Sequence, residues 1–371
     1  MLTYFCYHGL LLLIVFLLLR SVWQSSYTSF RHFRVLSWLG GFSAVMFALL
    51  FSEFIGGRVS FNLAIHGLAW YGSFFLFASA FLMYRQKKSN EKLRRGLPTF
   101  VLLFGVIYFG VAANTLLFEP IALVVREKTI ITPKITKPIT IVFCSDIQSN
   151  SVGWYERWTL RKVKEQNADL IIFGGDYISG GTDAERAQSM KDWNHFFREI
   201  NLQAPLGIYA VRGTDVHDWA RWKEKFVDTG IIPHEYTLTE QIGEIRITFL
   251  SIDDSETNRT IPDEEREGQF RIIVGHSPRF ALAEQDANLL LAGHTHGGQV
   301  QIPFWGPIIH LSGRDFPRRW ATGTTAMSNG ATLIVTHGTG LVRGSAPRVR
   351  FWCRPDFWVI RLVPEKVETQ Q

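Results

Sequence analysis

Cysteine is scarce in this chain. The 371 residues include only Cys6, Cys144 and Cys353, which excludes the disulfide framework that stabilises many small secreted domains. Cys144 lies inside an apolar run and is expected to be a small buried hydrophobic residue. The chain also has no internal repeat and no low-complexity tract. Its 47% of hydrophobic residues is enough for a membrane bundle and for one domain with a sizeable core.

A strong excess of one charge is also lacking. The chain has 39 Lys and Arg residues against 33 Asp and Glu residues, and the net charge of +6 requires no nucleic-acid partner. Much of the positive charge lies between Arg85 and Arg95. The simplest role of that cluster is to set membrane topology and to contact anionic lipid headgroups.

Four long apolar stretches precede the rest of the chain, over about residues 3–19, 35–55, 61–84 and 97–118. A hydrocarbon core of about 30 Å needs about 20 helical residues, so these stretches are long enough to span it. The first lacks a basic flank and a small-residue cleavage site, which favours a retained helix over a signal sequence. We therefore expect an all-α transmembrane bundle of about four helices over residues 1–118, a linker over residues 119–138 that is an extended strand or tether, and a second domain over residues 139–371.

Basic residues between the stretches predict an orientation. The first connection carries Arg20, Arg31 and Arg34, the third carries the cluster from Arg85 to Arg95, and the second carries only Arg58. Connections rich in Lys and Arg face the cytoplasm. The sequence thus predicts an integral membrane protein, with the lipid bilayer as a partner and the second domain extracytoplasmic.

Metal-ligand side chains follow several apolar runs of the second domain. The run TIVFCSD ends in Asp146, and the run DLIIFGGD ends in Asp176. In RIIVGHSP the apolar residues are followed by a Gly-His pair at His276, and LLLAGHTHGG carries both His294 and His296. Ligands bind at the carboxyl ends of strands in open α/β sheets, so these side chains are expected to converge. The glycines beside the two histidines let the backbone pass close to an ion. An alternative role for Asp146 and Asp176 is to cap helices that follow their strands.

The alternation of strands and helices favours an α/β domain. Strands are expected near Thr140, Leu170, Ile208, Ile247, Ile272, Leu289, Leu333 and Trp358. Helices are expected over residues 158–166, 184–200, 219–227 and 278–284.

The order of these motifs resembles that of the calcineurin-like metallophosphoesterase superfamily, in its membrane-anchored branch with N-terminal transmembrane helices. The resemblance covers about residues 139–362. It implies a four-layer αββα sandwich of two mixed sheets with helices outside, and a hydrolase that acts on phosphate ester bonds. It also implies two divalent metal ions, from among Mn, Fe, Zn and Mg, that activate a water to attack phosphorus.

The resemblance assigns a role to each motif residue. Asp146 and His296 would bind the first ion, His276 and His294 the second, and Asp176 would bridge both. Gln148 stands where the family has a histidine. Because an amide oxygen is a harder ligand than imidazole, the first site is expected to favour manganese or magnesium, and manganese is preferred overall.

The third motif, GTDVHD, also departs from the family pattern GNHD and can be aligned in two ways. Without a gap, Thr214 replaces the metal-binding asparagine and Asp215 replaces the histidine beside the phosphoryl group. With a two-residue bulge, Asp215 becomes the ligand, and His217 with Asp218 restores the pair. The ungapped alignment is favoured because insertions disturb ligand turns. Asp215 and His217 are therefore the candidate groups for aiding the leaving group.

These features predict a metal-dependent phosphoesterase that hydrolyses a phosphodiester or pyrophosphate, on a substrate derived from the membrane. One alternative is an enzyme like the UDP-2,3-diacylglucosamine pyrophosphatase of lipid A assembly. That reaction needs a cytoplasmic nucleotide substrate, which the expected orientation disfavours. The other alternative is a catalytically silent membrane scaffold, because two motif histidines are missing.

Overall fold

The computed structural model describes residues 60–86, 96–179, 181–214, 218, 221–262, 268–310, 312–342 and 348–365. The chain divides into two compact units, residues 1–118 with 344–348, and residues 119–343 with 349–371. The expected spans at residues 3–19 and 35–55 lie outside the described residues, as do Asp215 and His217.

The described part of the first unit consists of two helices. Helix α3 (Ser60–Gln86) covers the third apolar stretch. Helix α4 (Leu97–Ala113) continues through the π-helix η2 (Asn114–Phe118) into a 3-10 turn, η3 (Glu119–Ile121). Residues 97–121 form the one helix, within the described ranges, that is long and apolar enough to cross a membrane, with a mean hydropathy of 2.1. The four-helix bundle stays a prediction.

The second unit contains two six-stranded mixed sheets. The first has the strand order β1 (Val124–Thr132), β14 (Asp356–Pro364), β2 (Ile139–Cys144), β3 (Leu170–Phe173), β4 (Ile208–Val211) and β5 (Ile231–His234). Strands β2 to β5 are parallel, and β14 runs antiparallel to β2. The central strands β3 and β4 are apolar along their whole length because both faces of the sheet are covered.

The second sheet has the order β12 (Gly323–Ala326), β13 (Thr332–Val335), β9 (Leu289–Ala292), β8 (Phe270–Val274), β7 (Ile245–Phe249) and β6 (Leu238–Ile242). Its inner four strands are parallel and its two edge strands are antiparallel to their neighbours. A short hairpin of β10 (Gln301–Ile302) and β11 (Gly306–Pro307) stands apart from both sheets.

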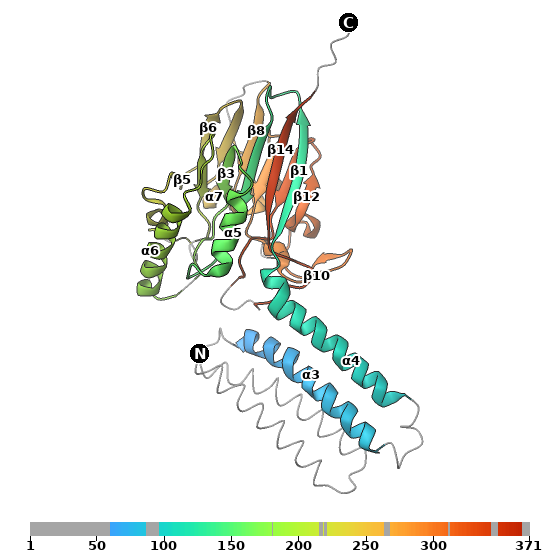
Figure 1. Cartoon of the computed structure of the whole chain (residues 1–371). Helices are drawn as coiled ribbons and strands as arrows, with labels where there is room; N and C mark the ends of the chain where they lie inside the picture. The colour runs from blue at the N-terminus through green and yellow to red at the C-terminus, as the bar shows by residue number, and fades with distance from the viewer. Residues whose placement is uncertain are drawn as a thin grey trace. The chain divides into compact units, whose positions relative to one another are not determined.

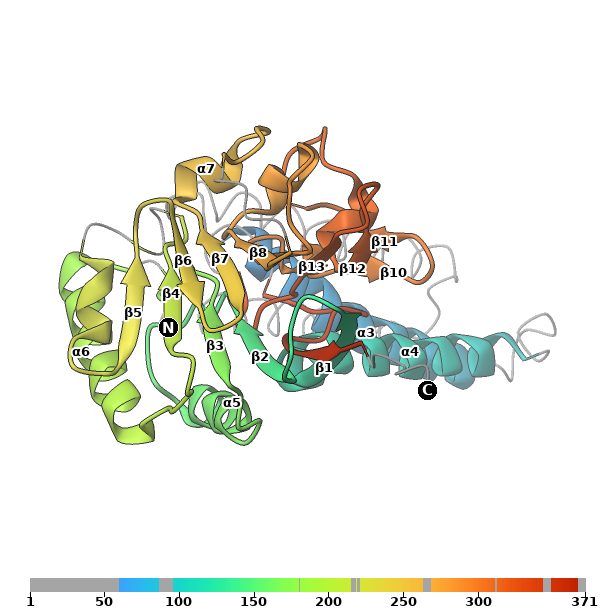
Figure 2. The same cartoon turned by 90° about the horizontal axis from the view of Figure 1, so that it is seen from above.

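The sheets are stacked face to face, and Figure 2 shows their two rows of strands end on. A buried cluster that includes Phe143, Ile172, Phe249 and Leu291 fills the space between them. On the outer side of the first sheet lie α5 (Trp154–Lys164) and α6 (Asp183–Ile200) (Figure 1).

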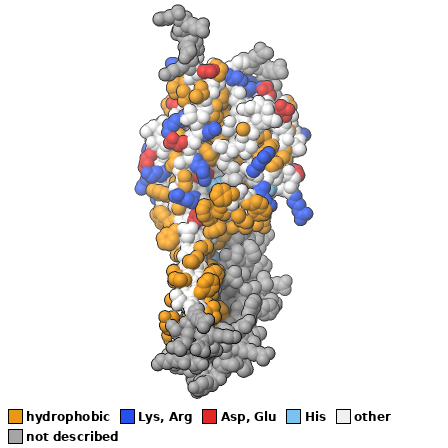
Figure 3. All heavy atoms as spheres, turned by 90° about the vertical axis from the view of Figure 1, so that its right-hand side faces the viewer, with side chains coloured by type: hydrophobic (Ala, Val, Ile, Leu, Met, Phe, Trp, Pro, Cys, Tyr) orange, Lys and Arg blue, Asp and Glu red, His pale blue; other side chains and the backbone are white. Residues whose placement is uncertain are grey.

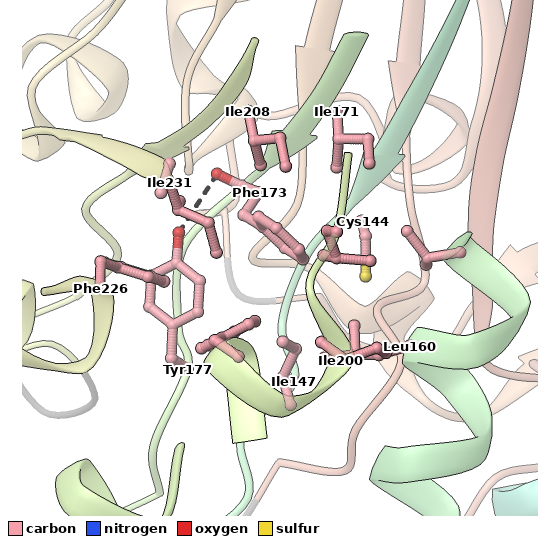
Figure 4. Packing of buried hydrophobic residues seen from close by; sticks show 14 of the residues in the cluster. Cys144, Ile147, Leu160, Ile171, Phe173, Tyr177, Ile200, Ile208, Phe226 and Ile231 are labelled. Carbon is pink, nitrogen blue, oxygen red and sulfur yellow. Dashed lines mark hydrogen bonds between the residues drawn. The ribbon is translucent and has the colours of Figure 1, made fainter. Parts of the chain in front are cut away.

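The outer face of the first sheet is packed with large apolar side chains. Phe173 and Ile208 from the sheet meet Leu160 of α5, Ile200 of α6 and Tyr177 in the loop after β3 (Figure 4). This packing fixes the backbone that follows β3, where the metal-ligand candidate Asp176 lies.

The expected linker contributes β1, in agreement with the extended-strand alternative; β1 pairs with β14 along its whole length and belongs to the compact unit. Two other expectations need correction. The helix expected over residues 219–227 is a 3-10 helix, η4 (Trp222–Phe226), that places Trp222 and Phe226 in the core. The helix expected over residues 278–284 is likewise a 3-10 turn, η5 (Pro278–Leu282). Together with α7 (Ile252–Glu256), η5 forms the layer on the outer side of the second sheet. Because both elements are short, this layer is thinner than a layer of long α-helices.

Candidate metal centre

The candidate ligands lie where parallel strands of the two sheets end. Asp146 follows β2, Asp176 follows β3, His276 follows β8 and His294 follows β9. Backbone hydrogen bonds tie the loops to one another, from Asp146 N to Gly175 O (3.0 Å) and from Gly293 N to the carbonyl of His276 (2.9 Å). The sandwich therefore brings together residues that are far apart in the sequence.

Most of these residues have an uncommon backbone conformation. Asp146, Gln148, Asp176, His294 and His296 all have positive φ, between 43° and 67°. Residues other than glycine seldom adopt this conformation, and it concentrates at sites where a side chain must be aimed. The ligand loops are therefore held in place by the surrounding fold.

Asp176, Thr214, His276 and His294 form what we call the Asp176 half of the centre. Donor atoms of Asp176, His276 and His294 lie within 4.8 Å of one another. His276 Nε2 is 3.3 Å from Asp176 Oδ1 and 3.3 Å from His294 Nδ1. His276 Nδ1 donates to Gly174 O at 2.7 Å, which directs Nε2 towards the other ligands. Thr214 donates to Asp176 Oδ1 from its backbone nitrogen (2.7 Å) and its hydroxyl (2.9 Å).

Asp146, Gln148 and His296 form the Asp146 half. Asp146 is fully buried, and its Oδ1 is 3.3 Å from His296 Nε2. The backbone nitrogen of His294 donates to both carboxylate oxygens of Asp146, at 3.1 and 3.0 Å. Gln148 Nε2 donates to Asp176 Oδ2 at 3.0 Å, so its amide group lies between the two halves.

Three glycines allow the loops to approach this closely. A Cβ at Gly293 would lie 2.2 Å from Asp146 Oδ2, and one at Gly213 would lie 2.2 Å from Asp176 N. Gly338, which has a positive φ of 71°, would place a Cβ 2.5 Å from that of Asp146. A side chain at any of the three positions would displace a ligand.

The buried carboxylates favour a positive charge in this region. Burial raises the pKa of Asp146 to about 6, with His276 lowering it and Asp176 raising it further. Burial lowers the pKa of His276, but the nearby carboxylates of Asp176 and Asp146 outweigh this effect and raise it to about 10. A proton on His276 and a metal cation bound between these groups would each compensate the negative charge of the buried carboxylates.

The residues fit divalent metal ions. The donor set combines carboxylate oxygens, imidazole nitrogens and one amide, which is the chemistry that Mn, Fe, Zn and Mg use in proteins. The Oε1 atom of Gln148 is buried and has no hydrogen-bond partner within the described residues, so it can accept a cation without losing a bond. The structure thus brings together Asp146, Gln148, Asp176, Thr214, His276, His294 and His296. The roles of these residues as individual ligands stay predictions.

A buried ion pair that the sequence reasoning missed supports the Asp176 half. Asp218 Oδ2 accepts from Asp176 N and Gly213 N, both at 2.8 Å, and its Oδ1 lies 3.4 Å from Lys225 Nζ. Both side chains are fully buried, and Lys225 Nζ also lies 4.3 Å from the ring centre of Tyr177. The sequence points to Asp218 only as part of the His-Asp pair in the bulged alignment of the third motif, whereas Lys225 has no motif signal.

A second polar cluster lies behind His296. The fully buried Arg350 donates to the carbonyls of His337 (2.9 Å), Gly338 (3.1 Å) and Cys353 (2.8 Å). The thiol of Cys353 lies 3.2 Å from His296 O. His337 follows β13 at the same sheet edge as the ligands, but it is buried and its Nδ1 donates to Arg354 O at 2.9 Å. These residues support the ligand turn from behind.

Comparison with known proteins agrees with this site. A family model described as calcineurin-like phosphoesterase matches residues 139–298. The uncharacterized metallophosphoesterase YkuE of Bacillus subtilis is 31% identical over 215 residues, which cover 54% of this chain and 70% of that protein. The phosphodiesterase YaeI of Escherichia coli is 29% identical over 96 residues, which cover 25% of this chain and 32% of that protein.

The likeness to a solved structure is weaker. A purple acid phosphatase from yellow lupin seeds aligns over 59% of this chain and 46% of its own, with a TM-score of 0.35 and 11% sequence identity. The family match and the Bacillus relative, together with the convergence of the ligand set, settle the assignment. The chain belongs to the calcineurin-like metallophosphoesterase family and is a hydrolase of phosphate ester bonds.

Proposed function

We propose that this protein is a membrane-anchored phosphodiesterase or pyrophosphatase that uses two divalent ions and acts on a substrate derived from the membrane. The observation that best supports a two-ion site is the position of Asp176. Its Oδ1 lies near His276 in one half of the centre, and its Oδ2 accepts from Gln148 of the other half. A carboxylate in this position can bridge two cations and reduce their mutual repulsion.

The chain's own residues would position the ions and the substrate. His276 and His294 would hold the second ion with Asp176, and Asp146 with His296 and Gln148 would hold the first. Ions bound there would lower the pKa of a water and neutralise negative charge on the phosphate. The positive φ of the ligand residues pre-sets the loops, which reduces the reorganisation needed during the reaction. Asp215 or His217 would aid the leaving group.

Manganese is the ion we favour. Gln148 offers a neutral oxygen donor, and Asp146 and Asp176 offer carboxylate oxygens, so three of the six side chains that would hold the ions are hard donors. A diester is the favoured substrate class because the Escherichia coli relative is named a phosphodiesterase.

The sequence and one helix support the proposed membrane anchoring. Residues 97–121 are long and apolar enough to span a bilayer, and they lead directly into the catalytic unit. The basic clusters on the first and third connections favour a catalytic unit outside the cytoplasm. This orientation favours a lipid-derived phosphoester over a cytoplasmic nucleotide.

Turnover of bis-p-nitrophenyl phosphate by the purified full chain tests the activity. We expect hydrolysis that needs a divalent ion, is best with Mn²⁺, and is lost in Asp176→Asn and His294→Ala. Asp183→Asn, an exposed acid in the first turn of α6, is the matched control and should retain activity. Hydrolysis that survives both ligand substitutions would show that the reaction does not take place at this centre. No hydrolysis with any ion would favour the alternative of a catalytically silent membrane scaffold.

A reporter fusion tests the orientation. Alkaline phosphatase joined after Glu365 should be active in cells, because that enzyme folds only in an oxidising compartment. A fusion of the same kind after Gln86 should be inactive, since the third connection is expected in the cytoplasm. The opposite pair of results would place the catalytic unit in the cytoplasm and return the nucleotide-linked substrate to consideration.

A further inference from the structure

The β10–β11 hairpin exposes an unusual number of large apolar side chains. Phe304 at its tip is fully exposed, Ile309 is 73% exposed and Trp352 on the neighbouring segment is 62% exposed. Together these residues form what we call the hairpin patch: Ile302, Phe304, Trp305, Ile308, Ile309 and Trp352. Figure 3 views this face of the catalytic unit and shows hydrophobic side chains gathered there with Lys and Arg side chains nearby. A contiguous apolar surface of this kind marks an interaction site.

Backbone hydrogen bonds make the hairpin patch one surface. Gln301 N donates to Phe351 O, and Phe351 N donates to Gln299 O, each at 2.9 Å. These bonds hold Trp352 beside the base of the hairpin. Two residues separate the hairpin from the 3-10 turn His296–Gly298, so the first residue of the patch, Ile302, lies six residues after a candidate metal ligand.

The charge around the patch is positive. Arg318 places its guanidinium carbon 3.8 Å from the ring centre of Trp305, and Arg314 and Arg319 are exposed nearby in the sequence. Residues 299–313 contain no Asp or Glu. The acid that follows, Asp315, is held by two hydrogen bonds from Arg279, at 2.7 and 2.9 Å. The patch therefore combines aromatic and aliphatic side chains with arginines that suit anionic phosphates.

The patch also lies close to the point where the apolar helix joins the catalytic unit. Glu119, the first residue of that unit, accepts a hydrogen bond from Cys353 N at 2.6 Å, next to Trp352. Arg354 donates to Ala122 O at 2.8 Å. The helical segment 97–121 ends between these contacts. Within the catalytic unit, Trp352 of the hairpin patch is therefore next in sequence to Cys353, which contacts the end of the candidate membrane span.

We propose that the hairpin patch is a second membrane contact, in which Phe304, Trp305 and Ile309 enter the interfacial layer of an anionic bilayer and the arginines meet lipid phosphates. Tryptophan is favoured at this depth, and arginine keeps its charge at the headgroups while its stem lies among apolar groups. This inference rests on the proposed membrane anchoring. The contact would hold the turn that bears His296 next to the lipid headgroups.

Spin labels on the full chain test this contact. Cys6→Ser removes a native thiol, and the other two, Cys144 and Cys353, are buried. Phe304→Cys then carries a nitroxide at the hairpin tip. Tyr236→Cys is the matched control, because Tyr236 is 75% exposed and follows β5, on the far side of the unit from β10 in Figures 1 and 2. Each protein is reconstituted in vesicles of phosphatidylcholine and phosphatidylglycerol, and collisions with oxygen and with a water-soluble nickel complex are measured.

We expect the label at position 304 to collide several-fold more with oxygen than with nickel, and the label at position 236 to show the reverse. Equal behaviour of the two labels would overturn the inference. A label at position 304 that is shielded from both agents would also overturn it, since a second copy of the chain or another protein would then cover the patch. Metal-dependent hydrolysis of bis-p-nitrophenyl phosphate in the same vesicles distinguishes the two proposals, because a water-exposed label with retained turnover refutes only the membrane contact.

Discussion

The two halves of the metal centre are built differently. In the Asp176 half, a carboxylate and two imidazoles bring their donor atoms within 4.8 Å of one another. In the Asp146 half, Asp146 and His296 lie 3.3 Å apart and the third donor is the amide of Gln148. For the softer divalent ions, a neutral amide is a weaker ligand than imidazole. If both halves bind an ion as proposed, the Asp176 half is expected to bind its ion more tightly than the Asp146 half.

The supports behind the two halves also differ. A buried carboxylate, Asp218, holds the backbone nitrogens next to Asp176. A buried guanidinium, that of Arg350, holds the carbonyls of the segment behind His296. Each support therefore orients a ligand loop through its backbone, one by accepting hydrogen bonds and the other by donating them. Substitutions in either half should separate the contribution of the ligand from that of its support.

The largest effect is expected from Asp176→Asn. Because the two oxygens of Asp176 contact both halves, the substitution should lower kcat/KM by more than the 10- to 100-fold that is typical of residues behind a ligand, roughly 1,000-fold. Asp146→Asn should cost less, since it disturbs one half. Steady-state hydrolysis of a soluble diester with saturating Mn²⁺ measures both. Equal losses would mean that the centre works as a single undivided site.

Asp218→Asn should have the next largest effect. An amide keeps the shape of the carboxylate, but its NH2 group must face backbone donors or the ammonium of Lys225. We expect kcat/KM to fall about 10- to 100-fold, with a higher Mn²⁺ concentration needed for half-maximal rate. Asp228→Asn, whose carboxylate forms an exposed ion pair with Arg198, is the control. A variant that loses heat stability but keeps its metal dependence would assign Asp218 a purely structural role.

Much of the fold could be predicted from local patterns. Short apolar runs such as residues 170–173 and 289–292 are strands with both faces buried, and the sequence identifies them by composition alone. Strand β1 could not be found in this way. Its partner β14 pairs Val124 with Asp356, more than two hundred residues later, and local sequence carries no record of such a contact. The 3-10 helix at residues 222–226 also depends on tertiary packing, because Trp222 and Phe226 must both reach the core.

The residues that come together in the candidate metal centre could be predicted for a chemical reason. Asp and His after apolar strands are rare enough to be informative, so the sequence alone points to Asp146, Asp176, His276, His294 and His296. The left-handed backbone at four of these five residues could not be predicted, because it results from the packing of neighbouring loops. The same holds for the burial of Lys225, which only the assembled core reveals.

Gln148→His tests the difference between the halves directly. Gln148 is buried, and an imidazole there would supply the donor that the family pattern has at this position. We expect the apparent affinity for Zn²⁺ to rise about tenfold and that for Mn²⁺ to change less, because imidazole suits Zn²⁺ better than amide oxygen does. Metal titrations of turnover measure this, with the exposed Gln188→His as control. An unchanged preference would show that Gln148 does not determine metal choice.

The smallest effect on turnover is expected from Lys225→Met, which instead changes the pH dependence of stability. Burial lowers the pKa of Lys225 to about 8, although Asp218 raises it in part, whereas an unfolded lysine has its ordinary pKa of 10.5. Between these values the folded chain has released a proton that the unfolded chain still binds, so this group makes stability rise with pH, by up to about 3 kcal/mol. Lys225→Met should lack that rise. Heat-unfolding midpoints across the window from about pH 8 to pH 10.5 measure it. Parallel pH profiles for the two proteins would show that Lys225 keeps its proton because Asp218 compensates fully for its burial.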